Sequence, residues 1–256
     1  MLIDTHTHLY SSQFDEDRLE MIQRAKAAGV HSVYLPSIDS TYYEAMLEME
    51  RQDPDWCKLM IGLHPCHVKE NVKEELNFVR AQLESRKFAA IGEIGIDLYW
   101  DKSFKQAQMD ALALQIDWAD EYKLPIVLHV RDAFDELFEV LEAKKDKNPN
   151  GIFHCFTGNI EQAENAISRG FKLGLGGVLT FKNAGLDKVV ENIDLEHLVL
   201  ETDSPYLAPH PHRGKRNETS YVNLVAEKLA AIKGISLDTV IEKTGVNALD
   251  IFVPYN

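Results

Sequence analysis

Histidines and carboxylates placed where apolar runs end give this sequence its first indication of chemistry. His6 and His8 lie two positions apart, at the end of the apolar run that begins at Leu2. In an extended strand, side chains alternate between two faces, so both imidazoles would point the same way and could bind one metal ion. One such pair could equally be two polar residues at the frayed start of a strand. The metal interpretation gains weight because similar residues follow later apolar runs: His64, Glu93, His129, His154, Glu201 and Asp203.

A repeating order of elements must position these side chains. A short apolar run, a polar or glycine-marked break and an amphipathic stretch follow one another along the whole chain. The apolar runs predict strands, and the helical spacing of apolar residues between them predicts helices. The predicted strands are 2–9, 31–36, 58–62, 88–93, 125–129, 151–154, 171–175 and 198–201. The predicted helices are 17–28, 40–51, 70–84, 103–121, 133–143, 160–168, 186–191 and 220–233.

Strands that alternate with helices imply parallel pairing through crossover connections. Eight such units in a chain of 256 residues are typical of an α/β protein with a (β/α)8 TIM barrel. An open doubly wound sheet is the competing fold, but it would need a glycine-rich turn after the first strand, which here ends in histidines. We expect a single barrel domain over residues 1–256, with an extra C-terminal helix at 237–251.

Composition restricts the function and the compartment. The net charge of −14 argues against a protein that coats duplex DNA, because such binding needs many lysine and arginine contacts to phosphates. The three cysteines, Cys57, Cys66 and Cys155, are too few and too widely spread for a disulfide framework. The sequence shows no signal-peptide pattern and no apolar run of the ~18 residues that a membrane span needs. We therefore expect a cytoplasmic protein that has no membrane partner and no obligate protein partner.

A barrel would bring the candidate residues together, because the C-terminal ends of its strands face one shared mouth where active sites lie. Histidines and carboxylates from several strands suit one or two divalent ions. Imidazole favours zinc or nickel, whereas carboxylates admit magnesium and manganese, so the identity of the metal stays open. Glu201 either orients a ligand from below Asp203 or is a buried carboxylate paired with a lysine or arginine of the barrel. Alternation predicts that Cys155, which directly follows His154, turns away from the metal.

Seven motifs in order along the chain resemble those of the TatD family of metal-dependent hydrolases, and the resemblance covers nearly the whole sequence. The motifs are His6-Thr7-His8, Gly62-Leu63-His64-Pro65, Gly92-Glu93-Ile94-Gly95-Ile96-Asp97, Leu128-His129-Val130-Arg131, His154-Cys155-Phe156-Thr157-Gly158, Glu201-Thr202-Asp203-Ser204-Pro205-Tyr206-Leu207 and Arg213-Gly214-Lys215-Arg216-Asn217-Glu218. Two positions depart from the family pattern: Cys66 follows His64-Pro65, and Thr219 stands where the family usually has proline.

The resemblance implies an amidohydrolase-like barrel and deoxyribonuclease activity, including exonuclease action at DNA ends, with DNA as the substrate. The metal ligands that it implies are His6, His8, Glu93, His129, His154 and Asp203. On this hypothesis His6 and His8 hold one ion, His129 and His154 hold the other, and Glu93 bridges them. The catalytic groups would be Glu93 and Asp203, with Asp203 accepting the proton of the attacking water.

Other residues near the strand ends are candidates for substrate contacts. Arg131, Arg213 and His64 would bind the phosphate, or else form ordinary surface or barrel ion pairs. Tyr99 and Trp100 follow the fourth strand and would either stack on a base or cap the barrel rim.

Two other functions fit the same residues. A metal-dependent hydrolase of a different ester or amide, such as a phosphotriester, lactone or aminoacyl ester, would use the same site, since the fold does not choose the bond. A metal-stabilised binding protein without turnover is the other alternative. The complete set of ligand residues and the proton acceptor at Asp203 count against it.

Overall fold

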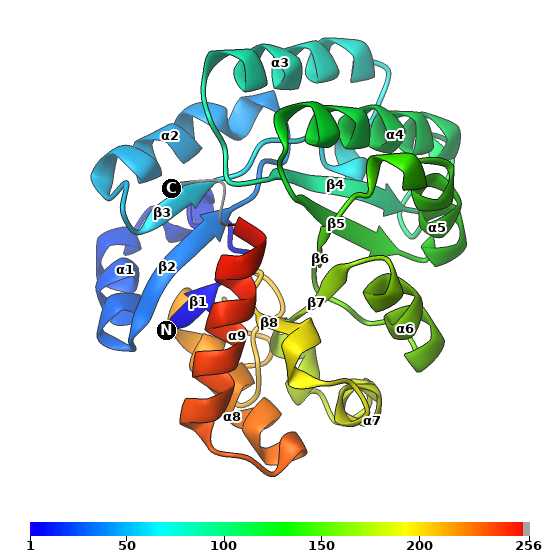
Figure 1. Cartoon of the computed structure of the whole chain (residues 1–256). Coiled ribbons are helices and arrows are strands. Elements are labelled where there is room, and N and C mark those ends of the chain that lie inside the picture. Colours follow the sequence, from blue (N-terminus) through cyan, green and yellow to red (C-terminus); the bar gives the residue numbers. More distant parts are fainter. Residues whose placement is uncertain (253–256) are drawn as a thin grey trace.

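The structure, a computed structural model, describes residues 1–252, and strands alternate with helices along it (Figure 1). The strands are β1 (Leu2–Asp4), β2 (Val30–Leu35), β3 (Cys57–Leu59), β4 (Ile91–Asp97), β5 (Ile126–Arg131), β6 (Gly151–Phe153), β7 (Phe171–Leu175) and β8 (Leu198–Leu200). The α-helices are α1 (Arg18–Ala27), α2 (Tyr43–Gln52), α3 (Val72–Ser85), α4 (Lys105–Tyr122), α5 (Phe134–Ala143), α6 (Ile160–Ser168), α7 (Leu186–Glu191), α8 (Val222–Lys233) and α9 (Leu237–Phe252). Within residues 1–252, no helix combines the length and the apolar character that crossing a bilayer requires.

The strands form a parallel barrel, as the alternation of elements predicts. Regular pairing gives two parallel sheets, one in the order β1-β2-β3 and one in the order β4-β5-β6-β7-β8. Backbone hydrogen bonds join the sheets on both sides. Gly92 donates to the carbonyl of Ile61 at 2.9 Å, and Thr5 donates to the carbonyl of Leu200 at 3.0 Å. The ring of strands is therefore closed between β3 and β4 and between β8 and β1.

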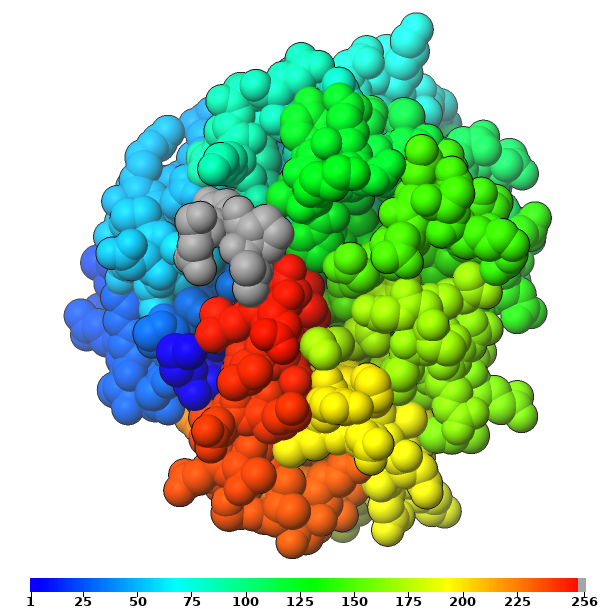
Figure 2. Space-filling view, in the orientation of Figure 1, coloured from blue at the N-terminus to red at the C-terminus, as the bar shows by residue number. Residues whose placement is uncertain are grey.

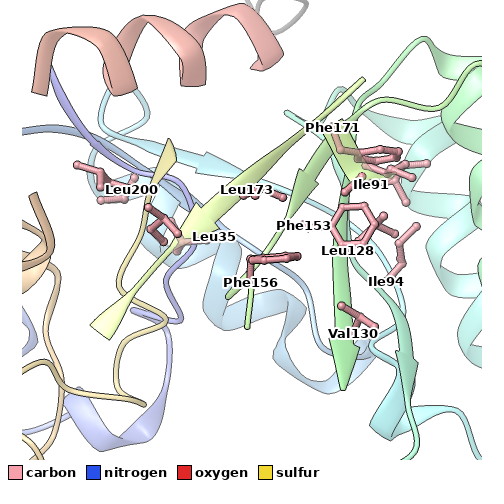
Figure 3. Packing of buried hydrophobic residues seen from close by; sticks show 14 of the residues in the cluster. Leu35, Ile91, Ile94, Leu128, Val130, Phe153, Phe156, Phe171, Leu173 and Leu200 are labelled. Atoms are coloured by element: carbon pink, nitrogen blue, oxygen red, sulfur yellow. The ribbon is translucent and has the colours of Figure 1, made fainter. Parts of the chain in front are cut away.

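A hydrophobic layer fills the space between the strands and the surrounding helices. Successive strands contribute large buried side chains, among them Leu128, Phe153 and Phe171 (Figure 3). The ring of Phe153 lies 5.1 Å from that of Phe171 and 5.9 Å from that of Phe138 on α5, measured between centroids. Because these strands are covered on both faces, they are continuously apolar rather than alternating, as expected for a parallel sheet.

The extra C-terminal helix is present as predicted, and α9 closes one end of the barrel. It runs along β1 and β8 and crosses the face shown in Figures 1 and 2. Phe252 stacks on Tyr34 of β2 with ring centroids 3.8 Å apart, in a cluster that also contains Ile3. A Cβ atom at Gly245 would lie 2.0 Å from the carbonyl oxygen of Met1, so this close approach requires glycine. The opposite end of the barrel is left for the polar side chains.

The predicted bounds of several strands were wrong in a way that matters for the site. The fourth strand was predicted to end at Glu93, but β4 spans Ile91–Asp97 and places Glu93 near its middle. His129 likewise lies inside β5. The first strand is shorter than predicted, since β1 ends at Asp4, and His6 and His8 follow it in irregular backbone. The apolar run therefore marks where the chain is buried and not where the ladder of strand hydrogen bonds begins and ends.

Candidate metal centre

The segments that follow β1 and β8 are held together by backbone hydrogen bonds beyond the ends of both strands. The amide of Asp203 donates to the carbonyl of His6 at 2.9 Å. The amide of His8 donates to the carbonyl of Ser204 at 2.8 Å. These bonds fix His6, His8 and Asp203 relative to one another, although the residues lie almost 200 positions apart in the chain.

Three imidazole Nε2 atoms converge on two carboxylates. Nε2 of His6 lies 3.1 Å from Oε2 of Glu93 and 3.8 Å from Oδ1 of Asp203. Nε2 of His8 lies 3.4 Å from Oδ1 of Asp203 and 3.9 Å from Oε2 of Glu93. Nε2 of His154 lies 3.8 Å from an oxygen of each carboxylate, and its ring stacks on that of His6. Five ligand-type side chains from four segments of the chain therefore meet at one place.

Two more histidines lie on the other side of Glu93. Its Oε1 atom is 2.8 Å from Nδ1 of His129 and 3.3 Å from Nε2 of His64. The side chains close enough to share one ion form groups that include His6–Glu93–His154 and His64–Glu93–His129. Glu93 belongs to both groups. His129 and His154 were expected to bind the same ion, but no such group contains both of them. The six predicted ligands are thus brought together, and how they divide between ions stays a prediction.

The residues present fit a divalent metal ion. Both ring nitrogens of His6 are buried, and neither makes a hydrogen bond within the described part of the chain. Leaving such groups unpaired is costly, so a buried imidazole that makes no hydrogen bond even to Oε2 of Glu93, 3.1 Å from its Nε2, indicates a missing ligand. The donors around it are imidazole nitrogens and carboxylate oxygens, the combination that zinc and related ions accept.

The electrostatics of the cluster keep its carboxylates ionised. Burial opposes the charged form of Glu93, but His64, His6 and His154 hold the pKa of that carboxyl well below its usual range. Asp203 behaves similarly: burial opposes its ionisation, and the neighbouring imidazoles of His8 and His154 lower its pKa. Ionised carboxylates are the form that binds a cation.

The pKa values of the histidines in this cluster shift in different directions. Burial and the neighbouring His154 lower the pKa of His6 to about 4, so His6 is neutral with a lone pair available. Burial also disfavours the charged forms of His129 and His154, but carboxylates outweigh it. Asp97 and Glu93 raise the pKa of His129 to about 9, and Glu201 and Glu93 raise that of His154 to about 10. These two imidazoles therefore hold a second proton that partly balances the carboxylates, and an imidazole must release that proton before it can bind a metal ion.

Tyr10 orients His8 and was not identified from the sequence. Its hydroxyl donates to the carbonyl of Pro36 at 2.6 Å and lies 2.7 Å from Nδ1 of His8. Because the hydroxyl proton is used for Pro36, Tyr10 accepts from His8, and Nδ1 must carry the imidazole proton. Nε2 of His8 is then left with its lone pair toward Asp203. No periodic pattern in the sequence signals this contact.

Asp97 is a second residue without a predicted role, and it supports His129. Its Oδ2 atom lies 2.9 Å from Nε2 of His129. Its backbone is held by the amide group of Gln108 on α4, which bonds both the amide and the carbonyl of Asp97. Glu93 and Asp97 are four positions apart on β4, so strand alternation places them on one face, and this signal was available in the sequence.

Glu201 lies beside His154, the position expected of a residue that orients a metal ligand. It is fully buried, and its Oε1 atom lies 2.8 Å from Nδ1 of His154. The same oxygen accepts the amide of Cys155 at 2.6 Å. The prediction that Cys155 turns away from the site was wrong, because Cys155 lines the pocket. β6 ends at Phe153 and Cys155 adopts a left-handed backbone with φ of 44°, so strand alternation no longer applies.

The cluster forms the floor of a pocket of about 590 Å³. His64 and Arg131, two of the three predicted phosphate contacts, line it. Arg213 is not one of the lining residues: it is exposed, and its guanidinium lies 4.3 Å from the ring centroid of Phe181. Arg216 of the same basic run pairs with Asp17 beside α1. The substrate role of Arg213 stays a prediction.

Comparisons with known proteins agree with this geometry. The family model described as TatD related DNase matches residues 3–253. The chain is 40% identical to YabD of Bacillus subtilis, named an uncharacterized metal-dependent hydrolase, over 98% of this chain and 99% of that protein. It is 30% identical to a protein of Erwinia tasmaniensis named 3′-5′ ssDNA/RNA exonuclease TatD, over 98% and 99% of the two chains. The crystal structure of YJJV, a TatD homolog from Escherichia coli K12, superposes with a TM-score of 0.92 at 29% identity and covers 98% of each chain.

Proposed function

Because this chain belongs to the family of TatD-related DNases and is a metal-dependent hydrolase, we propose that it cleaves phosphodiester bonds at the ends of single-stranded DNA. The observation that carries the proposal is the convergence of six ligand-type side chains, five of which line a pocket whose wall holds Arg131. A phosphodiester is an anion, and arginine is well suited to its oxygens. The relative named a single-strand exonuclease supports the same substrate class.

The residues that would hold the ions are Glu93 and five side chains near it: His6, His8, His129, His154 and Asp203. When bound there, one or two divalent ions would supply positive charge to the phosphoryl oxygens and lower the pKa of a water. Glu93 lies between both groups of imidazoles and keeps its negative charge at neutral pH, because its pKa is lowered. It is therefore the residue that holds the two halves of the site together.

Asp203 is the candidate for proton transfer. It faces the pocket, and its carboxyl is ionised at neutral pH because its pKa is lowered. It can accept the proton of the attacking water and later return it to the oxygen of the departing nucleotide. Nε2 of His8 lies 3.4 Å from its Oδ1 atom.

His64 contributes a hydrogen-bond donor rather than a metal ligand. Its Nδ1 atom accepts the amide of Cys66 at 3.1 Å, so the ring proton lies on Nε2. Burial lowers the pKa of His64, which keeps this ring neutral. Nε2–H points toward Glu93 and the pocket, where it can donate to a phosphate oxygen in the same way as Arg131.

We place this activity in the cytoplasm, since Cys57, Cys66 and Cys155 are free thiols, which a reducing compartment maintains.

A panel of substrates tests the proposal. The metal-loaded protein is incubated with an end-labelled single-stranded oligodeoxynucleotide, its RNA counterpart and its duplex, and with a lactone, a phosphotriester and an aminoacyl ester. We expect the single-stranded DNA to be shortened fastest, and Asp203→Asn to slow this reaction by at least about a hundredfold. Asp238→Asn, an exposed carboxylate at the start of α9, is the matched control and should retain full activity. Turnover of an ester or lactone without cleavage of any oligonucleotide would overturn the proposal.

A further inference from the structure

An exposed tryptophan stands at the wall of the metal pocket. The chain has three tryptophans. Trp56 and Trp118 are 5% and 8% exposed, whereas Trp100 is 72% exposed and lines the pocket. Tyr99 beside it is 51% exposed. If these aromatic residues merely capped the barrel rim, they would be covered by neighbouring side chains. A large aromatic surface left open to water beside a binding site indicates that a ligand covers it.

The two rings and an arginine form one assembly. The centroids of Tyr99 and Trp100 are 4.8 Å apart, with ring planes at 88°, so the rings meet edge to face. The guanidinium carbon of Arg131 lies 3.7 Å from the centroid of Tyr99 and 5.4 Å from that of Trp100. Arg131 therefore shields Tyr99 and adds a positive charge next to the indole, while the indole itself stays exposed.

The loop that carries Tyr99 and Trp100 is tied to the metal centre. Oδ1 of Asp97 accepts the amide of Tyr99 at 3.0 Å, and Oδ2 of the same carboxylate pairs with Nε2 of His129. A few residues further on, Asp101 forms an ion pair with Lys69 at 3.2 Å. One carboxylate thus positions a predicted metal ligand and the aromatic pair together. The fold therefore fixes the aromatic pair relative to His129.

We propose that Trp100, supported by Tyr99 and Arg131, is a stacking subsite for an unpaired nucleobase of the nucleotide whose phosphate enters the metal pocket. This inference rests on the proposed nuclease function and adds the residues that would hold the base of the substrate. A base can cover the indole with its flat face, while Arg131 neutralises the adjacent phosphate. A base inside a duplex is stacked on both sides and paired, so the subsite selects single strands and frayed ends.

The location of the tryptophans provides a binding test that does not depend on catalysis. The metal-loaded protein is titrated with thymidine monophosphate, which has no phosphodiester bond to cleave, and, separately, with deoxyribose phosphate, which lacks the base, while tryptophan fluorescence is followed. We expect the nucleotide alone to quench the emission, because Trp100 is the exposed indole and the other two are buried. Trp100→Phe should abolish the quenching. Equal responses to the two ligands, or quenching that persists in Trp100→Phe, would overturn the subsite.

Kinetics provide the second test. Trp100→Ala should raise KM for a single-stranded oligodeoxynucleotide by about tenfold with little change in kcat, and Trp100→Phe should restore most of the loss. An oligonucleotide with an abasic terminal residue should show no dependence on position 100. An unchanged KM in Trp100→Ala would overturn the subsite while the nuclease function stands. If the parent protein cleaves no oligonucleotide, the nuclease function fails, and the fluorescence titration alone decides whether a base binds at Trp100.

Discussion

Nδ1 of His8 and the hydroxyl of Tyr10 lie 2.7 Å apart, and the direction of this hydrogen bond determines which nitrogen of His8 can bind a metal. Since Tyr10 donates to Pro36, it must accept from His8. Removing the hydroxyl in Tyr10→Phe frees the imidazole to rotate or change tautomer. We expect metal affinity to fall by about 10–100-fold, the usual effect of losing a partner that orients a ligand. Competition with a chromogenic chelator measures the dissociation constant.

Tyr42→Phe is the control for this variant. The ring of Tyr42 packs 5.7 Å from that of Tyr10, so the control alters the same aromatic cluster without touching His8. Its metal affinity should match that of the parent. If Tyr10→Phe also binds metal as tightly as the parent, then Tyr10 does not orient His8.

Glu93 is the residue whose loss should affect the metal most. It alone approaches both groups of histidines, so Glu93→Gln removes the negative charge that balances them. We expect the loss of metal affinity to exceed the ~10–100-fold caused by changes at supporting residues. Metal content after dialysis, measured by mass spectrometry, compares this variant with the parent and with Glu227→Gln, an exposed control on α8. Equal metal content in all three would reject Glu93 as a ligand.

Metal binding should stabilise the folded chain, because the ligand residues meet only in the folded barrel. Adding metal to chelated protein at a thousand times its dissociation constant should add about 4 kcal/mol to the free energy of unfolding. For a chain of this size each kcal/mol raises Tm by about 2–4 °C, which differential scanning calorimetry can measure. Tm of the Glu93→Gln variant should respond much less at the same metal concentration. Equal responses would place the stabilising ion elsewhere on the protein.

Asp17 provides a pH-dependent contribution to stability away from the metal site. Hydrogen bonds from Arg216 and Arg24 hold the pKa of Asp17 below its usual value of 3.8. A lowered pKa stabilises the folded state above about pH 4, and this contribution is lost as the pH falls through the folded value. We expect Asp17→Asn to cost up to about 1 kcal/mol near pH 7, since the pair is partly exposed, and less as the pH drops below about 4.

Urea unfolding at a series of pH values measures this difference. Asp15→Asn is a suitable control, because Asp15 also pairs with an arginine, Arg18, but its side chain is 61% exposed. Its replacement should change stability less. A cost for Asp17→Asn that is the same at low and neutral pH would contradict the assigned pKa shift.

The sequence could predict the barrel because burial leaves a periodic pattern. Each strand reads as an apolar run, each helix as an amphipathic stretch, and α6, α7 and β7 begin and end at the predicted residues. The candidate ligands could be recognised because they are histidines and carboxylates at the ends of these apolar runs. The pattern of burial did not locate the strand hydrogen bonds, so Glu93 and His129 were placed at strand ends although they lie within β4 and β5.

Contacts made by irregular backbone could not be predicted in the same way. Tyr10 contacts His8 and Pro36 from a loop, and no repeat in the sequence predicts a hydrogen bond to Pro36, which lies 26 positions away in the chain. Cys155 faces the pocket because its φ of 44° departs from strand geometry. Asp97 differs from these two, since a predicted strand that continued past Glu93 would have placed both carboxylates on one face.

Locating the bound metal by anomalous diffraction tests directly whether Glu93 and the surrounding histidines form a metal site. Crystals of the parent soaked in zinc or manganese would be measured at the absorption edge of the soaked metal. We predict anomalous peaks about 2.0–2.2 Å from Glu93 and from the nearest imidazole nitrogens of His6, His8, His129 and His154. A fully soaked crystal with no peak at Glu93, or with its peaks at surface carboxylates only, would contradict the assignment of the site.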